Sequence, residues 1–267
     1  MRVAESIVLL VFGAITAFAA GQPRLETIMP RGGQRGTEVA VEIYGQWLGD
    51  PFSVVFHQPG ITVSDIAQVD ENKITAKFTI APDCAVGTKA IRIATGRGIT
   101  NPRLFSVGNL FEIQEKEPNN DEAAPQVIAL NATVNGVVQN EDVDYFAVVL
   151  EQGGKLAVEA EAMRLGLALF DIKLRLFGPN GHELLTEDDT AMARQDAAFV
   201  YVAEQAGRHL IAVSEAAYSG AGNYYYRLHV GNFPRPLSVT PLGGAPDTDN
   251  NVTWLGDPKI GAQAIRT

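Results

Sequence analysis

Apolar and polar residues alternate over long stretches of the chain, which is the period of β-strands with one buried face. The clearest case is residues 37–44, where Val39, Val41 and Ile43 fall on one side of an extended chain and charged or small residues on the other. Further strands, bounded by Pro, Gly, Asn or Asp, are predicted at residues 53–56, 61–69, 73–80, 89–94 and 103–107. Short strands at this spacing predict a β-sandwich.

The second half of the chain repeats this rhythm. In residues 155–162, Leu156, Val158 and Ala160 share one face of the predicted strand. Other strands of this half are predicted at residues 172–176, 209–213 and 224–230. The sequence therefore predicts an all-β protein with two β-sandwich domains in tandem, at residues 21–109 and 110–231.

The first 20 residues differ from the rest of the chain. Arg2 precedes an apolar run at residues 7–18, and small residues follow at Ala19 and Ala20. This order is typical of a cleaved secretory signal peptide. The apolar run is shorter than the roughly 20 residues that span a bilayer, although a retained N-terminal anchor stays open as an alternative. We therefore expect a secreted or periplasmic protein with no membrane segment beyond the signal.

Charge is distributed unevenly. The chain of 267 residues has a net charge of −10, with 9 basic and 8 acidic residues in 21–110 but 8 basic and 19 acidic residues in 111–231. An acidic surface of this kind repels nucleic acid, so nucleic acid is excluded as a partner. The single cysteine, Cys84, cannot form an intramolecular disulfide and is interpreted as a small apolar filler.

An acidic segment, residues 115–121, joins the two blocks. Pro118 disfavours helix at the residue before it, so the segment is predicted to be extended there. Side chains alternate in an extended chain, which brings Glu115, Glu117 and Asn119 to one side. Several oxygen-bearing side chains are thereby placed in a row.

Two interpretations of this segment remain open. Calcium takes about six to eight oxygen ligands, and downstream Glu141, Asp142 and Asp144 would complete a shell that one strand cannot supply. Alternatively, the segment is a solvated linker in which Asn119 or Asn120 caps a short helical turn. The contiguous Asp-x-Asp-x-Asp-Gly calcium loop is missing from the sequence.

Turn glycines and alternating apolar residues in the first block recur in four segments, Pro30-Arg-Gly-Gly-Gln-Arg-Gly36, Val41-Glu-Ile-Tyr-Gly45, Trp47-Leu48 and Ala81-Pro-Asp-Cys-Ala-Val-Gly-Thr88. From about residue 25 to 108 the chain thus resembles the immunoglobulin-like IPT/TIG family. The resemblance implies an interaction or spacer domain, and it brings no catalytic residues.

The second block carries a more specific set of segments, Glu117-Pro-Asn-Asn-Asp121, Asp142-Val-Asp-Tyr-Phe146, Asp171-Ile-Lys-Leu-Arg-Leu-Phe177, Asn180-Gly181, Glu187-Asp-Asp189, Gly207-Arg-His-Leu-Ile-Ala-Val213 and Gly222-Asn-Tyr-Tyr-Tyr-Arg-Leu228. In this order and spacing they resemble the bacterial pre-peptidase C-terminal (PPC) domain, from about residue 110 to 231. The resemblance implies a compact jelly-roll-type sandwich of the kind appended to secreted hydrolases, some of which bind calcium.

The PPC resemblance also implies a ligand set for calcium. In calcium-binding members the ligands come from the Glu-x-Glu-Pro-Asn segment and the later acidic turn, which correspond here to Glu115, Glu117, Asn119, Glu141 and Asp144. Asn120 stands where some relatives have an aspartate, which removes one negative charge.

Signatures of catalysis are weak. The segment from His182 to Thr186 resembles the start of a zinc-protease helix, but Thr186 replaces the second histidine and a strand is favoured. The adjacent acids of residues 187–189 are interpreted as a solvated loop or a weaker second cation site, since glycoside hydrolysis needs two acids across a cleft. We expect no enzyme activity. Exposed tyrosines, Tyr201, Tyr218 and Tyr225, are an alternative platform for sugar or peptide.

The tail, residues 232–267, repeats features of the first block. Ser238-Val-Thr-Pro-Leu-Gly-Gly244 and a later Leu-Gly-Asp triplet match segments at residues 27–33 and 41–50. This predicts either the truncated start of a further immunoglobulin-like module or a tail that adds a strand to an existing sheet.

These observations predict an exported, non-catalytic binding or structural protein with a calcium-stabilised second domain. Its expected partner is an extracellular or cell-envelope polymer or protein. The alternative is the non-catalytic accessory region of a longer secreted hydrolase or peptidase.

Overall fold

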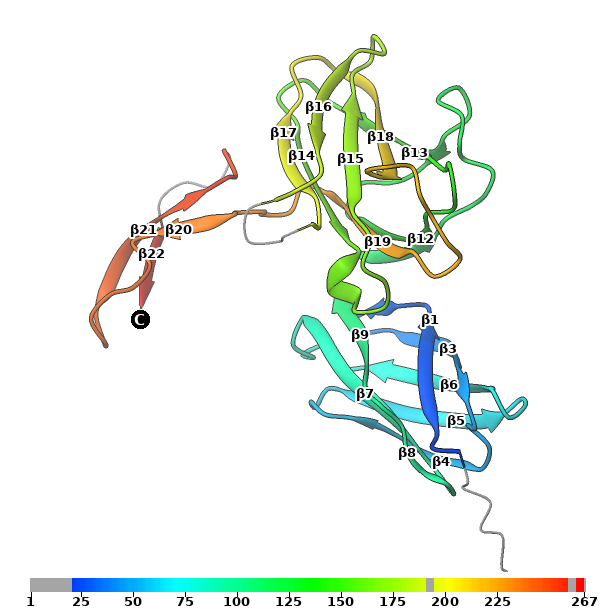
Figure 1. Ribbon diagram of the computed structural model, residues 1–267. Helices are drawn as coiled ribbons and strands as arrows, with labels where there is room; N and C mark the ends of the chain where they lie inside the picture. The colour runs from blue at the N-terminus through cyan, green and yellow to red at the C-terminus, as the bar shows by residue number, and fades with distance from the viewer. Residues whose placement is uncertain (1–20, 191–194, 259–262, 267) are drawn as a thin grey trace, which may run out of the picture.

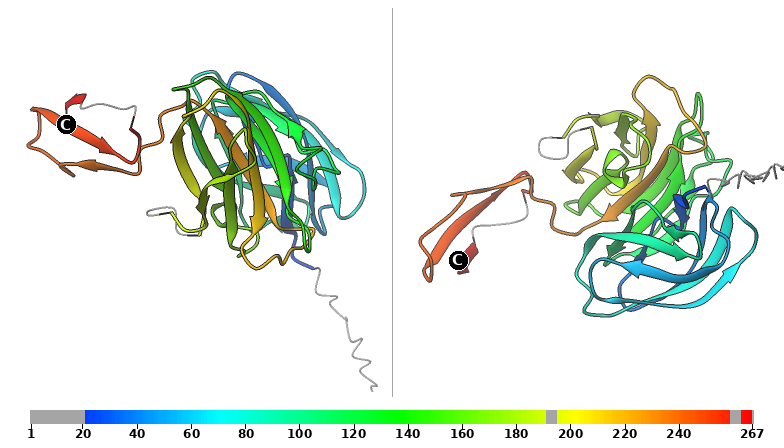
Figure 2. Two further views of the ribbon diagram at one scale, coloured as in Figure 1. Left: turned by 90° about the horizontal axis from the view of Figure 1, so that it is seen from above. Right: turned by 60° about the horizontal axis from the view of Figure 1, so that its bottom comes forward.

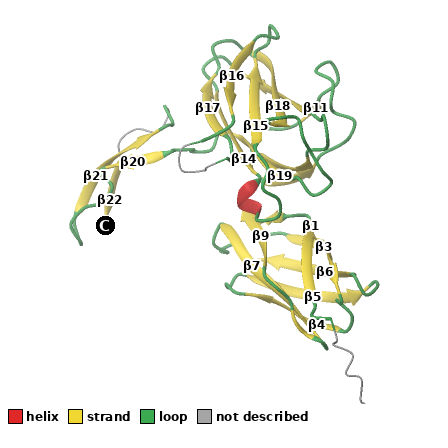
Figure 3. Ribbon diagram, viewed as in Figure 1, coloured by secondary structure: helices red, strands yellow, loops and turns green. Residues whose placement is uncertain are grey.

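A computed structural model of the chain describes residues 21–190, 195–258 and 263–266. The predicted signal segment, residues 1–20, lies outside them. Strands form nearly all the regular structure, and one short 3-10 turn, η1, spans Met163–Leu165 (Figure 3). In this part of the chain, no helix has the length and apolar character needed to span a bilayer.

The first module, residues 21–108, is a sandwich of two sheets (Figure 1). One sheet has the strand order β1-β3-β6-β5 and the other β2-β9-β7-β4, with β8 paired to β7. The strands are β1 (Arg24–Met29), β2 (Gly32–Gln34), β3 (Glu38–Gln46), β4 (Pro51–Phe56), β5 (Ile61–Gln68), β6 (Lys73–Ile80), β7 (Gly87–Thr95), β8 (Gly98–Ile99) and β9 (Arg103–Gly108).

Alternation decides which side chains of this module are buried. On β3, Val41 and Ile43 are buried and the charged residues face solvent. At the centre of the core, the ring of Phe78 meets those of Phe56 and Phe105 edge to face, with centroids 5.0 Å and 5.2 Å apart. The core of the first module is therefore built from the inner faces of both sheets.

The second module, residues 110–231, is another two-sheet sandwich. Its sheets have the orders β10-β12-β19-β14-β17 and β11-β13-β18-β15-β16. The strands are β10 (Phe111–Gln114), β11 (Gln126–Val127), β12 (Ala132–Val137), β13 (Asp144–Leu150), β14 (Lys155–Glu161), β15 (Ile172–Phe177), β16 (Glu183–Glu187), β17 (Ala198–Val202), β18 (Gly207–Glu215) and β19 (Tyr225–Gly231).

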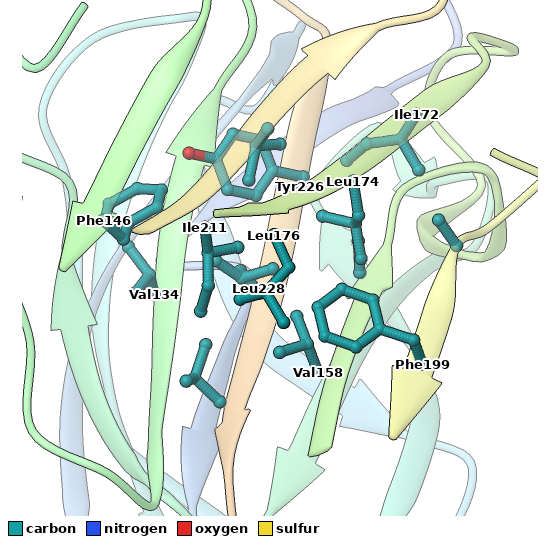
Figure 4. Close-up of a cluster of buried hydrophobic side chains, with 14 of the residues drawn as sticks. Val134, Phe146, Val158, Ile172, Leu174, Leu176, Phe199, Ile211, Tyr226 and Leu228 are labelled. Carbon is teal, nitrogen blue, oxygen red and sulfur yellow. The ribbon is translucent and has the colours of Figure 1, made fainter. Parts of the chain in front are cut away.

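The inner faces of these two sheets form a separate apolar core (Figure 4). Val134 and Leu228 from one sheet pack with Phe146, Leu174 and Ile211 from the other, and all five side chains are fully buried. The prediction of an all-β chain with two β-sandwiches in tandem is thus confirmed.

Each predicted strand overlaps an observed one. The segment that begins at His182 forms strand β16, as predicted, after a turn in which Gly178 N donates to His182 O over 2.9 Å. The structure adds strands where alternation is weak, notably β12 and β13, whose residues are buried almost without interruption.

The two modules meet at a joint that contains two fully buried arginines. Arg31 of the first module donates from Nη2 to Leu165 O of η1 over 3.1 Å, and its guanidinium lies 6.0 Å from the ring centre of Tyr225. Burial lowers the pKa of Arg31 to about 10, so the side chain remains charged at neutral pH. Gly32 packs on Arg227 of the second module, where a Cβ would lie 2.6 Å from Arg227 Cζ. The joint therefore has no space for a side chain at position 32.

Arg227 is the centre of an ionic network on the outer face of its sheet. It pairs with Glu112 through Nη2, and its Nη1 lies 3.4 Å from Glu161 Oε2. Burial raises the pKa of Glu161, but the hydrogen bond and charge of His229 and the charges of Arg227 and Arg164 outweigh it and lower the pKa to about 2. Glu161 is therefore a carboxylate that compensates the buried guanidinium.

The tail forms a three-stranded antiparallel sheet that projects beside the second module (Figure 2). Its strands are β20 (Ser238–Thr240), β21 (Asp249–Leu255) and β22 (Gln263–Arg266). Buried Asp257 accepts from Lys155 Nζ over 2.8 Å, and Arg235 Nε lies 2.5 Å from Glu159 Oε2. These ion pairs attach the tail to the second module.

The first two strands of the tail pair in the register of β1 and β3. Thr240 lies opposite Thr253, as Met29 lies opposite Glu42, with the same spacing along the chain in both pairs. In this register Leu255 occupies the position of Tyr44, so the Leu-Gly-Asp triplets of the two segments do not correspond. The repeated element is the strand pair, and the matching triplet was misleading.

Candidate metal centre

The acidic segment after β10 lies against the start of β13. Glu115 N donates to Asn135 O on β12 over 3.0 Å, and Tyr145 N on β13 donates to Asn119 O over 2.9 Å. Because β12 and β13 belong to different sheets, these bonds fix the segment across one edge of the second sandwich. The predicted one-sided row of oxygen ligands is thereby placed next to Asp144.

Three carboxylates converge at this point. Glu115, Glu117 and Asp144 each offer one oxygen atom, and these atoms lie within 4.8 Å of one another. Asp144 is fully buried, Glu115 is half-buried and Glu117 is exposed. In the described part of the chain, this is the group of His, Cys, Asp and Glu side chains with a geometry that could hold a metal ion.

The buried amide of Asn119 lies among these carboxylates. One of its two terminal atoms lies 3.3 Å from Glu115 Oε1. The other lies 3.1 Å from Asp144 Oδ1 and 3.0 Å from Glu117 Oε2. With the nitrogen towards Asp144 and Glu117, the amide donates to both, and both of its ends are satisfied in this orientation. The Asn119 side chain therefore links two of the three carboxylates of the group.

A tyrosine from a distant strand completes the group. The ring of Tyr226 lies in the apolar core, and its hydroxyl lies at the margin of that core (Figure 4). The hydroxyl oxygen is 2.6 Å from Glu115 Oε1 and 2.8 Å from Asp144 Oδ2. Gly136 on the neighbouring strand makes room for it, since a Cβ there would lie 2.4 Å from the hydroxyl oxygen. One hydroxyl proton cannot be donated to Glu115 and Asp144 at once, so the pair needs a second proton or a cation between them.

Negative charge accumulates at the site. Burial, followed by the charges of Glu115 and Asp142, raises the pKa of Asp144 to about 10. Burial and the same two neighbours also raise the pKa of Glu117. A divalent ion among these oxygens would favour the ionised carboxylates, because an adjacent positive charge lowers the pKa of a carboxyl group.

Glu141 lies outside the group. Its side chain is exposed, and its backbone has a left-handed φ of 57°, with Glu141 N donating to Tyr218 O over 2.9 Å. Buried Asp142 lies nearer the site and accepts from Asn120 Nδ2 over 2.5 Å and from Gln139 N over 3.0 Å. The structure thus brings together four of the five predicted ligands.

The turn after the segment is capped by a different residue from the two considered in the sequence. Asp121 Oδ1 accepts from Ala123 N over 2.8 Å, and Asp121 O accepts from Ala124 N over 2.9 Å. The predicted cap at Asn119 or Asn120 is wrong, because both amide groups contact carboxylates of the acidic cluster.

The donor set consists of oxygen atoms alone. Carboxylate and amide oxygens are the ligands of hard cations such as Ca²⁺, whereas zinc prefers sulfur and nitrogen. Exposed Glu117 leaves the site open to solvent on one side, so water molecules could complete the coordination. The arrangement can hold an ion.

Other residues considered for chemistry lie elsewhere. Cys84 is buried, with Sγ 3.9 Å from Pro59 O, in keeping with the role of a filler. The predicted tyrosine platform is not formed, because Tyr225 faces Arg31 at the joint and Tyr201 packs 5.9 Å from the ring of His209.

No family model matches the chain, and a comparison with curated proteins also found no match. Solved structures with partial likeness include an SGBP-B protein from the mixed-linkage glucan utilization locus of Bacteroides ovatus, in complex with a heptasaccharide. It is 11% identical, with a TM-score of 0.27 over 79% of this chain and 74% of that chain.

Two further solved structures are similar to the same extent. The SGBP-B protein of a xyloglucan utilization locus in Bacteroides uniformis is 13% identical over 79% of this chain and 72% of that chain, with a TM-score of 0.29. The Escherichia coli adhesin FdeC is 10% identical over 89% of this chain and 75% of that chain, with a TM-score of 0.28. Likenesses this weak assign neither a family nor a function.

Proposed function

We propose that the chain is an exported, non-catalytic binding or structural protein whose second module holds a calcium ion at Glu115, Glu117, Asn119 and Asp144. The observation that carries the proposal is the convergence of three carboxylate oxygens, from Glu115, Glu117 and fully buried Asp144, within 4.8 Å of one another. An ion at this point would give these oxygens a common positive partner.

Calcium here would act on stability. The ligands come from the connection that follows β10 and from the first residue of β13, so an ion would tie this connection to the sheet. Without the ion, burial and the neighbouring carboxylates raise the pKa of Asp144 to about 10, so an ion that binds at neutral pH takes the place of its proton. We therefore assign the ion a structural role.

The geometry supports binding or scaffolding more than turnover. Acid–base or hydrolytic catalysis needs carboxylates that reach a substrate, but Asp144 is fully buried beneath Asn119 and Tyr226. The partner in this proposal is an extracellular or cell-envelope polymer or protein. We assign the second module to the PPC family and the first to the IPT/TIG family on the segments quoted above.

A second candidate is the accessory region of a longer secreted hydrolase or peptidase. It is favoured by the tail, because β20 and β21 pair in the register with which the first module begins. A reading frame that continues past Thr267 into a catalytic domain would support this candidate, and a stop codon there would dismiss it.

Isothermal titration with CaCl₂ tests the metal centre directly. After removal of divalent ions with a chelator, the wild-type chain is expected to bind one Ca²⁺. Glu117→Gln should weaken binding about tenfold or more, because ligand charge sets affinity in such sites. Glu141→Gln is the matched control and should bind as wild type, since Glu141 lies outside the group. Absence of binding, or equal affinity of the Glu117→Gln variant, would contradict the proposal.

A further inference from the structure

The end of the first module that lies away from the joint is formed by connections between strands. The β3–β4 connection contacts the β5–β6 connection through Leu48 N and Glu71 O, 2.7 Å apart, and it contacts the end of β5 through Asp50 N and Gln68 Oε1, 3.0 Å apart. β1 starts at this end and leads towards the joint (Figure 1). Loops at the free end of a sandwich are common positions for binding sites, because a rigid scaffold supports them.

A hollow of about 550 Å³ opens at this end. It is lined by Glu26, Tyr44, Gly45, Gln46, Trp47 and Asn72. Glycine is required in its lining, because a Cβ at Gly45 would lie 2.1 Å from Arg24 O. The volume lies within the range of about 300–1,000 Å³ that is usual for small-ligand sites.

Trp47 is held at this hollow in an unfavourable backbone conformation. Its φ is 53°, a left-handed value that is strained for a bulky residue, and Trp47 is 42% exposed. Asp50 in the same connection also has a left-handed φ, of 54°. Buried Leu48 anchors the loop between them. The fold thus holds a large indole ring at the surface where burial would be expected.

The polar groups of the hollow are arranged in pairs. Gln46 Nε2 donates to Glu26 Oε1 over 2.7 Å, which leaves the amide oxygen and a carboxylate oxygen for a ligand. Lys73 pairs with Glu42 over 2.7 Å and lies 5.1 Å from the ring centre of Tyr44. The site therefore combines aromatic rings and planar hydrogen-bonding groups, with Glu26 as the charged residue of its lining.

These properties fit a sugar. A pyranose ring has an apolar C–H face that packs on an aromatic ring, and its adjacent hydroxyls bond to planar amide and carboxylate groups. The sequence of this module is nearly neutral, with 9 basic and 8 acidic residues in 21–110. The strongly acidic second module would repel an anionic polymer. An uncharged sugar chain is the favoured ligand.

We propose that the hollow at Trp47 and Tyr44 binds a neutral polysaccharide chain, an inference that rests on the proposed binding function and names the class of polymer. An open hollow at the tip of the first module admits an internal stretch of a polymer as readily as its end. Specificity comes from Gln46, Glu26 and Asn72, and most of the contact area comes from the two aromatic rings.

Affinity electrophoresis of the full chain tests this proposal. The gels contain a soluble β-glucan, a galactomannan, a xylan or, as the anionic comparison, polygalacturonate. Wild-type protein should be retarded in at least one neutral gel and not in polygalacturonate. Trp47→Ala should weaken the interaction about tenfold or more, and Gln46→Ala should weaken it to a smaller extent.

Phe52→Ala is the matched control, because Phe52 is a 69%-exposed aromatic residue of the same module outside this hollow. It should be retarded as wild type, and circular dichroism should show that all variants are folded. Glu117→Gln should also be retarded as wild type, which separates this test from that of the metal centre. Free migration of wild type in every neutral gel, or undiminished retardation of both Trp47→Ala and Gln46→Ala, would overturn the proposal. Free migration of the wild type in every neutral gel would point to a protein partner instead.

Discussion

Replacement of Arg227 by alanine is expected to destabilise the second module by about 3–5 kcal/mol, because it removes a buried guanidinium that pairs with two half-buried carboxylates. The guanidinium is 1% exposed and contacts Glu112 and Glu161. Loss of the side chain also removes the surface on which Gly32 packs, so the joint between the modules should loosen as well. Both effects arise from one residue because the ionic network borders the joint.

Urea unfolding followed by circular dichroism measures the first effect, and small-angle X-ray scattering measures the second. Arg208→Ala is the matched control, because Arg208 is exposed and donates to Glu122 O over 2.9 Å. Its loss should change the free energy of unfolding by about 0.5 kcal/mol or less. Equal stability of the two variants would show that the buried network contributes little.

Replacement of Phe78 by alanine is expected to destabilise the first module by about 3–5 kcal/mol, the usual range for removal of a buried aromatic ring. Phe78 is fully buried and is the ring that meets both Phe56 and Phe105 edge to face. The other two rings cannot close the resulting cavity without leaving their own contacts.

Differential scanning calorimetry of the full chain should show the loss in the transition of the first module alone, because the two modules have separate cores. Phe52→Ala removes the same number of atoms from a 69%-exposed position and should leave the midpoint nearly unchanged. A Phe78→Ala midpoint as high as that of Phe52→Ala would contradict the assignment of the core.

The fold was predictable from the sequence where one face of a strand is exposed to solvent. On β3 and β6 alternate residues are buried, so periodicity alone locates these strands. Strands β12 and β13 are covered on both faces, and continuous burial removes the alternating signal. The joint was not predictable either. Arginine is expected at the surface, and Arg31 and Arg227 are buried by the contact between the two modules.

The candidate site was partly predictable from the same alternation of side chains along an extended chain. Alternation placed Glu115, Glu117 and Asn119 on one side, and the structure brings them to Asp144. Local sequence could not reveal Tyr226, which reaches the site from a distant strand. Exposed Glu141 lies in the turn before β13 with a left-handed φ of 57°, so strand alternation could not place its side chain.

The most direct test of the central claim is thermal unfolding of the full chain in excess Ca²⁺ and in excess chelator. An ion bound only by the folded state adds about 2.7 kcal/mol at a hundredfold excess over its dissociation constant. An ion held by Glu117 should raise the midpoint of the second module's transition in Ca²⁺, and Glu117→Gln should abolish this shift. Identical midpoints of the wild-type chain in Ca²⁺ and in chelator would contradict it.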